Sequence, residues 1–424
     1  MSRLVGSFAL LVAISCSPSA PEPVPGYRAF VGATLIDGTG AEPKGDAVVV
    51  VRDGRIESVG SAAEMEVPPR AEIVDLAGRT LIPGLINAHG HVGDTLGLES
   101  GHYSEANVRA HLGLYASYGV TTVVSLGGDG AEGVRVRDAE GLDLRHARLR
   151  IAGAVVTAES PEEAHSQVQA NADLGADFIK IRVDDNLGTS TKMSPEVYGA
   201  VIEAAHSSSL PLAAHLFYLD DAKGLLRAGA DFIAHSVRDL PVDEELIGLL
   251  LETGVCYSPT LTREVSTYVY ESEPEFFADP FFLTHADRSV LDLLRTPEQQ
   301  QRYRDSPAAP RYKDALRMAQ ANLKALVDAG VTIAFGTDSG PPARFQGYFE
   351  HMETELMAEA GLSPRQILRS ATGDAAACVG LDDVGTIETG KWADMVVLSA
   401  DPMVELANLR AIESVWIAGN RMEP

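Results

Sequence analysis

One unit recurs through the centre of the chain: a helical stretch ends at a glycine, and a short apolar strand follows at once. Five such junctions begin at Gly119, Gly175, Gly229, Gly254 and Gly330. Glycine readily adopts the left-handed conformation that ends a helix, and a short continuous apolar run is typical of a strand buried on both faces. The repeat therefore predicts an α/β fold, a (β/α)₈ TIM barrel over residues 83–383.

The two ends of the chain have a different pattern. Residues 27–82 hold alternating strand-like runs with a hairpin signal at Asp53-Gly54, and residues 384–424 hold two further runs of this kind. Because the two segments flank the barrel, we expect them to meet in one small β-sandwich domain. Residues 262–312 break the repeat and are rich in aromatic and charged side chains. We expect a helical insertion there, either a lid over the barrel mouth or a peripheral element.

The first residues have the pattern of an export signal. A positive charge precedes an apolar stretch, residues 4–14, that is too short to span a bilayer. Residues 13–16 resemble the bacterial lipoprotein cleavage box, so residues 1–16 are predicted to be a lipoprotein signal peptide with lipidation at Cys16. Residues 17–26, rich in Pro and Ser, would form an extended linker. We expect an exported protein, either a periplasmic or cell-surface lipoprotein or, if the lipid box is not used, a secreted protein.

Acidic residues outnumber basic ones by 60 to 34, which gives a net charge of -26 at pH 7. Such a surface repels phosphate backbones, so we expect no nucleic-acid partner and membrane contact only through a lipid anchor at Cys16. Cys256 and Cys378 are isolated from each other in the sequence, and we expect both to be core residues without a disulfide. The sequence leaves the oligomeric state open.

Ionisable side chains stand where the predicted barrel strands end. Barrel enzymes assemble their sites from the carboxyl ends of their strands, so these residues are expected to converge although they are far apart in the sequence. Six residues hold such positions: His89, His91, Lys180, His215, His235 and Asp338. Four imidazoles and a carboxylate form a ligand set suited to Zn²⁺, with Mn²⁺, Fe²⁺ or Co²⁺ as other candidates.

Lys180 is the unusual member of this set, because it lies between two isoleucines on a strand that is predicted to be buried. A charged amine in that place loses much of its hydration energy unless its stem carries it to the barrel rim. Reaction with CO₂ would remove the charge and create a carboxylate able to bridge two metal ions. A CO₂-derived carboxylate on Lys180 is therefore one hypothesis, and an unmodified lysine at the rim is the other.

The chain resembles the amidohydrolase superfamily along almost all of its length after the predicted leader. The resemblance rests on residues 81–91 (LIPGLINAHGH), 336–338 (GTD) and 385–394 (GTIETGKWAD). It implies two divalent metal ions, with Zn²⁺ as the first candidate. The implied ligands are the six residues above: His89, His91 and Asp338 for the more buried ion, His215 and His235 for the more exposed one, and carboxylated Lys180 together with a hydroxide as bridges.

The resemblance also implies a mechanism. The bridging hydroxide would attack a polarised carbonyl, and Asp338, the implied catalytic residue, would pass the proton to the leaving amine. Residues 177–181 (DFIKI) are similar to the lysine-bridged, binuclear branch that includes Xaa-Pro and related dipeptidases. Mononuclear deaminases and imidazolonepropionase carry a glutamate three residues after the fifth-strand histidine, whereas here Tyr218 follows His215 at that spacing.

We therefore expect hydrolysis of an amide C–N bond in a small-molecule substrate, with a dipeptide or an N-acyl amino acid favoured. The alternatives are a heterocycle deaminase or cyclic amidase, and a surface lipoprotein that binds a partner without catalysis. Arg182 lies two positions after Lys180, so on a strand it points the same way and could pair with a substrate carboxylate. Tyr218 and Tyr257 could line the barrel mouth, and each of these three residues could equally serve packing alone.

Overall fold

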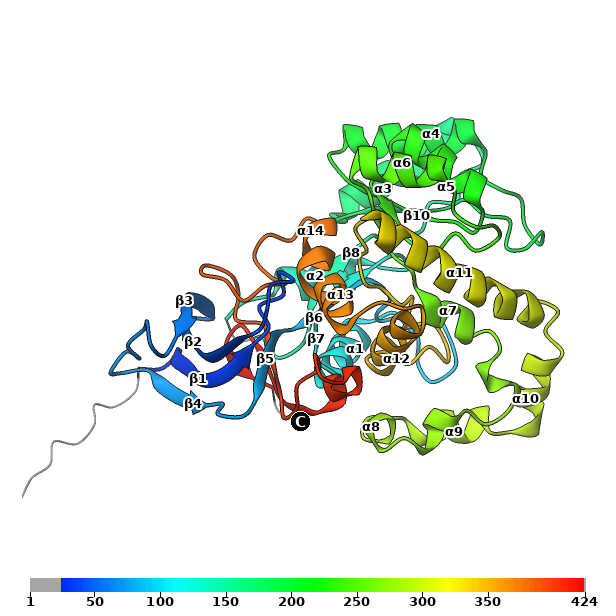
Figure 1. Cartoon of the computed structure of the whole chain (residues 1–424). Coiled ribbons are helices and arrows are strands. Elements are labelled where there is room, and N and C mark those ends of the chain that lie inside the picture. Colours follow the sequence, from blue (N-terminus) through cyan, green and yellow to red (C-terminus); the bar gives the residue numbers. More distant parts are fainter. Residues whose placement is uncertain (1–23, 143, 423–424) are drawn as a thin grey trace, which may run out of the picture.

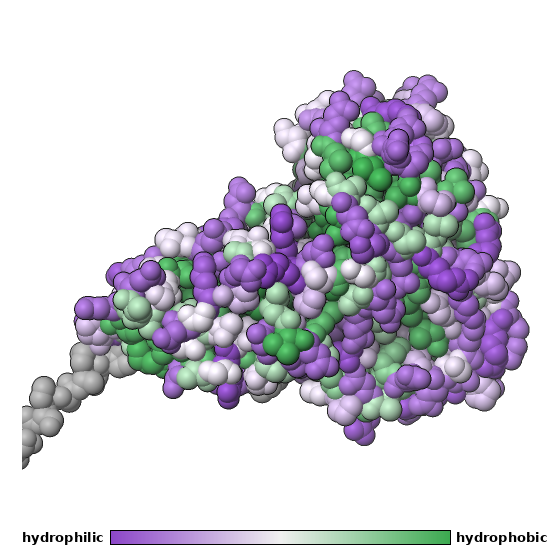
Figure 2. Space-filling view, viewed as in Figure 1, coloured by the Kyte–Doolittle hydropathy of each residue, from purple (hydrophilic) through white to green (hydrophobic). Residues whose placement is uncertain are grey.

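A computed structural model describes residues 24–142 and 144–422 of the chain. The predicted signal peptide, Cys16 and most of the predicted linker lie outside the described residues. Among the residues described, no helix combines the length and the apolar character that crossing a bilayer requires. Hydrophilic residues cover much of the face shown in Figure 2, with apolar residues interspersed between them.

Seven short parallel strands and one extended segment form the barrel wall. They are β6 (Leu85–Gly90), β7 (Val120–Ser125), β8 (Arg148–Ile151), β9 (Ile179–Arg182), β10 (Leu212–His215), β11 (Phe232–Ile233), β12 (Cys256–Tyr257) and residues 331–339. Regular pairing joins β6, β7 and β8 in one run and β9, β10, β11 and β12 in another.

Backbone hydrogen bonds close these two runs into a ring. Asp177 N donates to Ile151 O (2.8 Å) and Val156 N to Lys180 O (2.8 Å), which joins β8 to β9. On the other side, Ala334 N donates to Tyr257 O (3.0 Å), and Ala88 N donates to Phe335 O (2.8 Å). Residues 331–339 therefore act as the eighth strand between β12 and β6, and the predicted barrel is confirmed.

Helices follow the strands and cover the outside of the barrel (Figure 1). They are α1 (Glu105–Ser117), α2 (Ala131–Asp138), α3 (Pro161–Leu174), α4 (Pro195–Ser207), α5 (Leu219–Ala228), α6 (Glu244–Thr253), α11 (Ala309–Ala329), α12 (Tyr348–Glu359) and α13 (Pro364–Arg369). All five junction glycines have positive φ angles, between 70° and 96°. The prediction that these glycines end helices and allow the turn into a strand is confirmed.

Both ends of the described chain contribute to one small β domain. Its strands are β1 (Tyr27–Leu35), β2 (Lys44–Arg52), β3 (Arg55–Ser61), β4 (Glu72–Asp75), β5 (Thr80–Pro83), β13 (Met395–Leu398), β14 (Ile412–Ile417) and β15 (Asn420–Arg421). The strand order is β15-β14-β13-β5-β1-β2-β3, with β4 also beside β1, so β5 and β13 join the two ends of the chain. The predicted β domain is confirmed, and it lies to one side of the barrel (Figure 1).

The region from 262 to 312 consists of short helices. After α7 (Leu261–Val265) come η1 (Val269–Glu271), η2 (Glu275–Ala278), α8 (Pro280–Leu283), α9 (Arg288–Leu294) and α10 (Pro297–Arg304). Tyr270, Phe277 and Phe282 are buried, and they pack with Phe349 of α12. The aromatic residues of the insertion therefore fix it to the barrel, and its action as a lid stays a prediction.

The amino-terminal end of the barrel is closed by a disulfide-linked helix. Cys256 packs inside the barrel with Ile86, Phe178 and Ala213, and α14 (Ala375–Cys378) packs against the same cluster, directly after η3 (Ser370–Asp374). Cys256 and Cys378 form a disulfide across 122 residues. The prediction of two unbridged cysteines is wrong, because the barrel brings two distant segments together at a place that the spacing in the sequence does not reveal.

Candidate metal centre

Three side chains at the carboxyl end of the barrel form a compact group. His89 lies on β6, His91 directly follows that strand, and Asp338 comes from the eighth strand. One ligand atom from each lies within 4.8 Å of the other two. His91 Nε2 is 2.8 Å from Asp338 Oδ1, and His89 Nε2 is 3.6 Å from the same oxygen. The group has the size of a metal site.

Backbone carbonyls fix how these two imidazoles present their nitrogens. His89 Nδ1 lies 2.6 Å from Ala234 O, and His91 Nδ1 lies 3.0 Å from Gly127 O. A carbonyl oxygen can only accept, so each Nδ1 carries a proton, and a ring without a second proton turns a bare Nε2 lone pair inward. His91 Nε2 then faces a carboxylate oxygen at 2.8 Å. A divalent cation between these lone pairs would satisfy both atoms, so the residues fit a metal ion.

Lys180 completes this side of the centre. It is 3% exposed, and its Nζ lies 3.1 Å from His89 Nε2. Among the described residues, no carboxylate lies within ion-pair distance of this amine. Burial lowers the pKa of Lys180 to about 7. A substantial fraction of the amine is therefore neutral at neutral pH.

His215 and His235 form the second side of the centre. The two rings lie 4.0 Å apart between their centroids, and the ring of His235 lies 4.5 Å from that of His89. Burial lowers the pKa of His215 to about 3, although Asp184 opposes the effect, and burial lowers the pKa of His235 well below its usual value. The structure thus brings all six strand-end residues together, with both of these imidazoles neutral.

Side chains orient this second pair. His215 Nε2 lies 3.1 Å from Asp184 Oδ2, and His235 Nδ1 lies 2.7 Å from Thr260 Oγ1. The neutral His215 ring donates from Nε2 to the carboxylate, which leaves its Nδ1 lone pair for a cation. A carboxylate or another acceptor behind a ligating histidine is the usual arrangement around protein-bound metals.

Arg344 holds Asp338 in place. Its Nη1 donates to Asp338 Oδ2 at 2.5 Å, and its Nε donates to Ser266 Oγ at 3.1 Å. Although burial alone would raise the pKa of Asp338, the Arg344 guanidinium keeps it well below its usual value. Asp338 also has a positive φ of 57°, a strained conformation for a residue other than glycine. The carboxylate is therefore ionised and fixed in direction.

A buried glutamate on α12 ties the strands of the first group together. Glu350 Oε1 accepts hydrogen bonds from Asn87 Nδ2 (2.7 Å), Thr337 Oγ1 (2.6 Å) and Ser339 Oγ (2.6 Å). Asn87 and Thr337 flank His89 and Asp338 in the chain. The strand-end pattern of the sequence does not identify four of these residues, because they lie in loops or helices. They are Asp184, Thr260, Arg344 and Glu350.

The three candidate substrate contacts have different surroundings. Arg182 is the most open, and its Nε donates to Asp184 Oδ1 at 3.0 Å. Tyr218 is partly buried and donates to Asp185 Oδ1 at 2.7 Å. Tyr257 is fully buried, and its hydroxyl accepts from Val237 N at 2.6 Å. The expectation for Tyr257 is wrong, because alternation along β12 turns Cys256 into the barrel and Tyr257 outward into the layer beneath the helices.

Three cavities are lined by residues that follow the barrel strands or belong to the insertion. One, of about 660 Å³, is lined by Arg182, Asp184 and Lys192. A second, of about 870 Å³, lies between the insertion and the loops after β6 and the eighth strand, and its lining includes Leu293 and Tyr312. A third, of about 200 Å³, adjoins Arg344.

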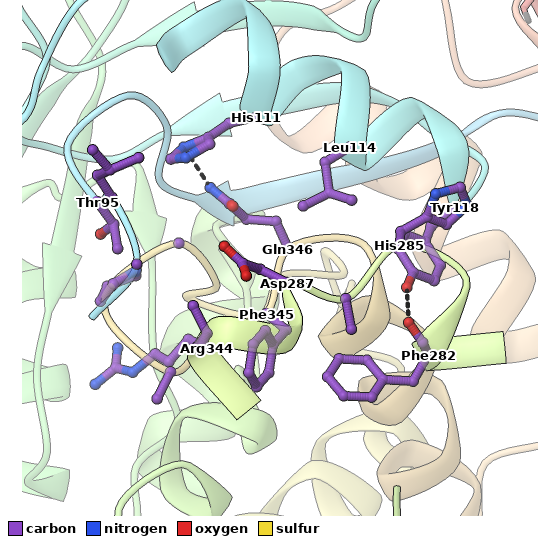
Figure 3. Close-up of a pocket in the computed structure, with 17 residues that line it drawn as sticks. Thr95, His111, Leu114, Tyr118, Phe282, His285, Asp287, Arg344, Phe345 and Gln346 are labelled. Atoms are coloured by element: carbon purple, nitrogen blue, oxygen red, sulfur yellow. Dashed lines mark hydrogen bonds between the residues drawn. The ribbon is translucent and has the colours of Figure 1, made fainter. Parts of the chain in front are cut away.

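The third cavity is drawn in Figure 3. There Gln346 Nε2 donates to His111 Nδ1 at 2.9 Å, and the Tyr118 hydroxyl donates to Phe282 O at 3.1 Å. Through Arg344, this cavity is one side chain away from Asp338. Arg344 therefore separates this cavity from Asp338.

Comparison with known proteins identifies the chain. The sequence pattern of the amidohydrolase family matches residues 80–422. The chain belongs to this family. An imidazolonepropionase of Streptomyces avermitilis is 25% identical to this amidohydrolase over 409 residues, 90% of this chain and 89% of the relative. An ochratoxinase of Aspergillus niger is 24% identical over 284 residues, 63% of this chain and 51% of the relative.

Solved structures of similar proteins share the whole fold. A candidate prolidase from Bifidobacterium longum superposes with a TM-score of 0.76 at 27% identity, covering 95% of this chain and 96% of its own. A Xaa-Pro dipeptidase with bound methionine gives a TM-score of 0.75 at 21% identity, covering 94% of this chain and 100% of its own. The resemblance to the amidohydrolases that the sequence motifs indicated is confirmed, and the chain is a metal-binding hydrolase of amide C–N bonds.

Proposed function

We propose that this amidohydrolase cleaves the amide bond of a small substrate that bears a carboxylate, a dipeptide or an N-acyl amino acid. The observation that carries the proposal is the convergence of four oriented imidazoles, one ionised carboxylate and one buried lysine at a single rim of the barrel. Neutral imidazoles and a carboxylate are ligands for divalent cations, and the cavity lined by Arg182 and Asp184 adjoins the residue that orients His215.

In this proposal two divalent cations, with Zn²⁺ as the first candidate, occupy the centre. His89, His91 and Asp338 would hold one, and His215 and His235 would hold the other. When bound, such a pair of cations lowers the pKa of water and polarises a carbonyl group. Each of the four histidine rings has one nitrogen against a partner, which leaves the other nitrogen for a cation and supports this division. The partners are Ala234 O, Gly127 O, Asp184 and Thr260.

Lys180 would bridge the two halves as a carboxylated amine. The neutral amine attacks CO₂, a new N–C bond forms, and one proton leaves, which turns the lysine into an anionic carbamate. The lowered pKa of Lys180, about 7, supports this step because burial favours the neutral form that reacts. The adjacent His89 Nε2, at 3.1 Å, places the amine where a bridging ligand is needed.

Asp338 would serve as the proton carrier. Its ionised carboxylate, oriented by Arg344, can accept the proton of the attacking water and deliver it to the leaving amine. Arg182, which lines a cavity together with Asp184, is the proposed partner for the substrate carboxylate. Tyr218 is the proposed second contact, because its ring lies 3.7 Å from the ammonium of Lys192, which lines the same cavity. The larger cavity at the insertion would take the remaining part of the substrate.

A second candidate, hydrolysis of a cyclic amide, is favoured by one observation. The imidazolonepropionase of Streptomyces avermitilis is similar along 90% of this chain. Tyr218 stands against this candidate, because the residue three positions after His215 is not the glutamate expected for that group. Lactams in the substrate panel below separate the two candidates.

We also propose export, with lipidation at Cys16 as its first form and ordinary secretion as its second. The Cys256–Cys378 disulfide supports the proposal, because stable disulfides are typical of compartments outside the cytosol. Mass spectrometry of the mature protein from native membranes tests it. A diacylated amino-terminal Cys16 is expected, and an intact leader on cytosolic protein would contradict it.

A substrate panel tests the proposed activity. The protein, loaded with Zn²⁺ or Mn²⁺ in the presence of bicarbonate, is assayed on dipeptides, N-acyl amino acids, lactams, lactones and phosphotriesters. Hydrolysis of dipeptides or N-acyl amino acids is expected, with loss of activity in Lys180→Ala and retention in Lys44→Ala, a matched change of an exposed lysine in the β domain. Activity on lactones or phosphotriesters alone would contradict the proposal.

A further inference from the structure

Thr260 has a backbone conformation that is costly for its residue type. Its φ is 47° and its ψ is 45°, in the left-handed region. Among residues 24–142 and 144–422, it is the one β-branched residue with a positive φ. A branched Cβ is especially unfavourable there, whereas glycine adopts this conformation freely. A glycine would therefore form the turn between β12 and α7 with less backbone strain. The presence of threonine at this position needs another explanation.

The Thr260 side chain points at the centre. Its Oγ1 lies 2.7 Å from His235 Nδ1, and the residue is 1% exposed. When Nδ1 donates to this hydroxyl oxygen, Nε2 keeps its lone pair. The centroids of the neighbouring His215 and His89 rings lie 4.0 and 4.5 Å from that of His235. The other tautomer would put a proton on Nε2 and could not ligate a cation. The hydrogen bond thus fixes the rotation of the ring, and in the tautomer with a protonated Nδ1 it leaves Nε2 free for a cation.

The segments on both sides of Thr260 are clamped, which keeps the strained conformation in place. Glu353 Oε1 accepts from Leu261 N at 2.7 Å, and its Oε2 accepts from Thr262 N at 2.7 Å. Before the turn, Ser236 Oγ donates to Pro259 O at 2.8 Å. Strain that is held in place by surrounding contacts is typical of functional sites.

We infer that Thr260 is a positioning residue that orients His235 for the cation held with His215. The inference rests on the proposed two-cation centre and adds to it a residue outside the ligand set. It makes the turn into α7 part of the site, because the same turn begins the insertion that covers the larger cavity.

Zinc binding to the metal-free full-length protein tests the inference without an activity assay. The protein is titrated calorimetrically with ZnCl₂, and two binding events are expected for wild type. Thr260→Val keeps the branched shape and removes the hydroxyl, so it should weaken one event by about 10- to 100-fold and leave the other unchanged. Thr260→Ser keeps the hydroxyl and should bind within a few-fold of wild type at both sites.

Thr260→Gly separates positioning from folding. It relieves the strained backbone, so its thermal midpoint should equal or exceed that of wild type while one zinc event weakens as in Thr260→Val. Thr267→Val, in the same segment and away from His235, is the control and should bind as wild type. If Thr260→Val does not fold, the comparison of Thr260→Gly with Thr260→Ser decides the question in its place.

Two outcomes would overturn the inference: unchanged binding in Thr260→Val or Thr260→Gly, or equal losses in Thr260→Ser and Thr260→Val. Failure of the proposed centre looks different. In that case wild type itself shows a single event or none, and the loss does not depend on residue 260.

Discussion

The two halves of the centre are held in different ways. His89 and His91 are oriented by the carbonyls of Ala234 and Gly127, which belong to the barrel backbone. His215 and His235 are oriented by the side chains of Asp184 and Thr260. A point mutation can remove a side-chain partner but leaves a backbone carbonyl in place.

This difference separates a part of the centre fixed by the fold from a part that single substitutions can tune. No substitution of a partner side chain removes the acceptors behind His89 and His91, whereas substitution of Asp184 or Thr260 removes those behind His215 and His235. We therefore expect mutations near the centre to fall into two classes, distinguished by which cation they weaken.

Asp338→Asn should give the largest effect, because it removes an ionised ligand of the first half together with the proposed proton carrier. We expect kcat to fall by about 10²- to 10⁴-fold, the range for loss of a general acid–base group. Steady-state kinetics and zinc stoichiometry measure it, with circular dichroism as the check on folding. A kcat within tenfold of wild type would remove Asp338 from the mechanism.

Removal of the disulfide tests whether the zinc affinities of the two halves depend on the amino-terminal end of the barrel, where α14 is linked to β12. The Cys256→Ala/Cys378→Ala double variant should lose about 2–5 kcal/mol of unfolding free energy, because the bond closes a long loop. Urea denaturation measures this loss. Both zinc affinities should stay unchanged in the folded variant, and a change in either would show that the α14 end is coupled to the centre.

Asp184→Asn should act on the second half alone. It removes the carboxylate behind His215, so we expect the second cation to bind about 10- to 100-fold more weakly while the first is unaffected. The neighbouring Asp185→Asn changes a residue that contacts Tyr218 and should bind zinc as wild type. Equal weakening of both cations in Asp184→Asn would mean that the two halves are not separable.

The pH dependence of stability tests the clamp behind Thr260. Burial raises the pKa of Glu353 from 4.5 to about 8 in the folded protein. Its contribution to stability is fully present below pH 4.5 and is lost as pH rises toward 8, because the unfolded chain releases the proton first. This group should lower the unfolding free energy by up to about 1.4 kcal/mol per pH unit in that window.

Urea denaturation between pH 5 and 8 measures this dependence. Glu353→Gln cannot titrate, so its stability should fall less steeply with pH than that of wild type. Parallel pH profiles for the two proteins would show that the folded carboxyl is already ionised at pH 5.

The sequence predicted the barrel and the six converging side chains because both follow from one local rule. Each strand ends at the same rim, so an ionisable residue at the end of each strand must reach that rim. Lys180 and His215 illustrate this rule. Lys180 lies two positions after Phe178, and His215 lies two positions after Ala213, so each points to the same inner side of its strand as that apolar residue. No knowledge of distant contacts was needed.

The parts that were missed depend on contacts between elements. Cys256 and Cys378 meet only because α14 packs against the amino-terminal end of the barrel. Tyr257 points outward because side chains alternate along the two-residue strand β12. Thr260 became visible only through its φ angle and the ring it faces. Partners behind ligands sit on loops whose path a repeat pattern does not determine.

A crystal structure of the zinc-loaded protein, with anomalous diffraction recorded at the zinc edge, tests the central claim most directly. The account predicts two anomalous peaks, one among His89, His91 and Asp338 and one at His215 and His235, joined by carboxylate density on Lys180. A single peak beside an unmodified Lys180 would contradict the two-cation centre.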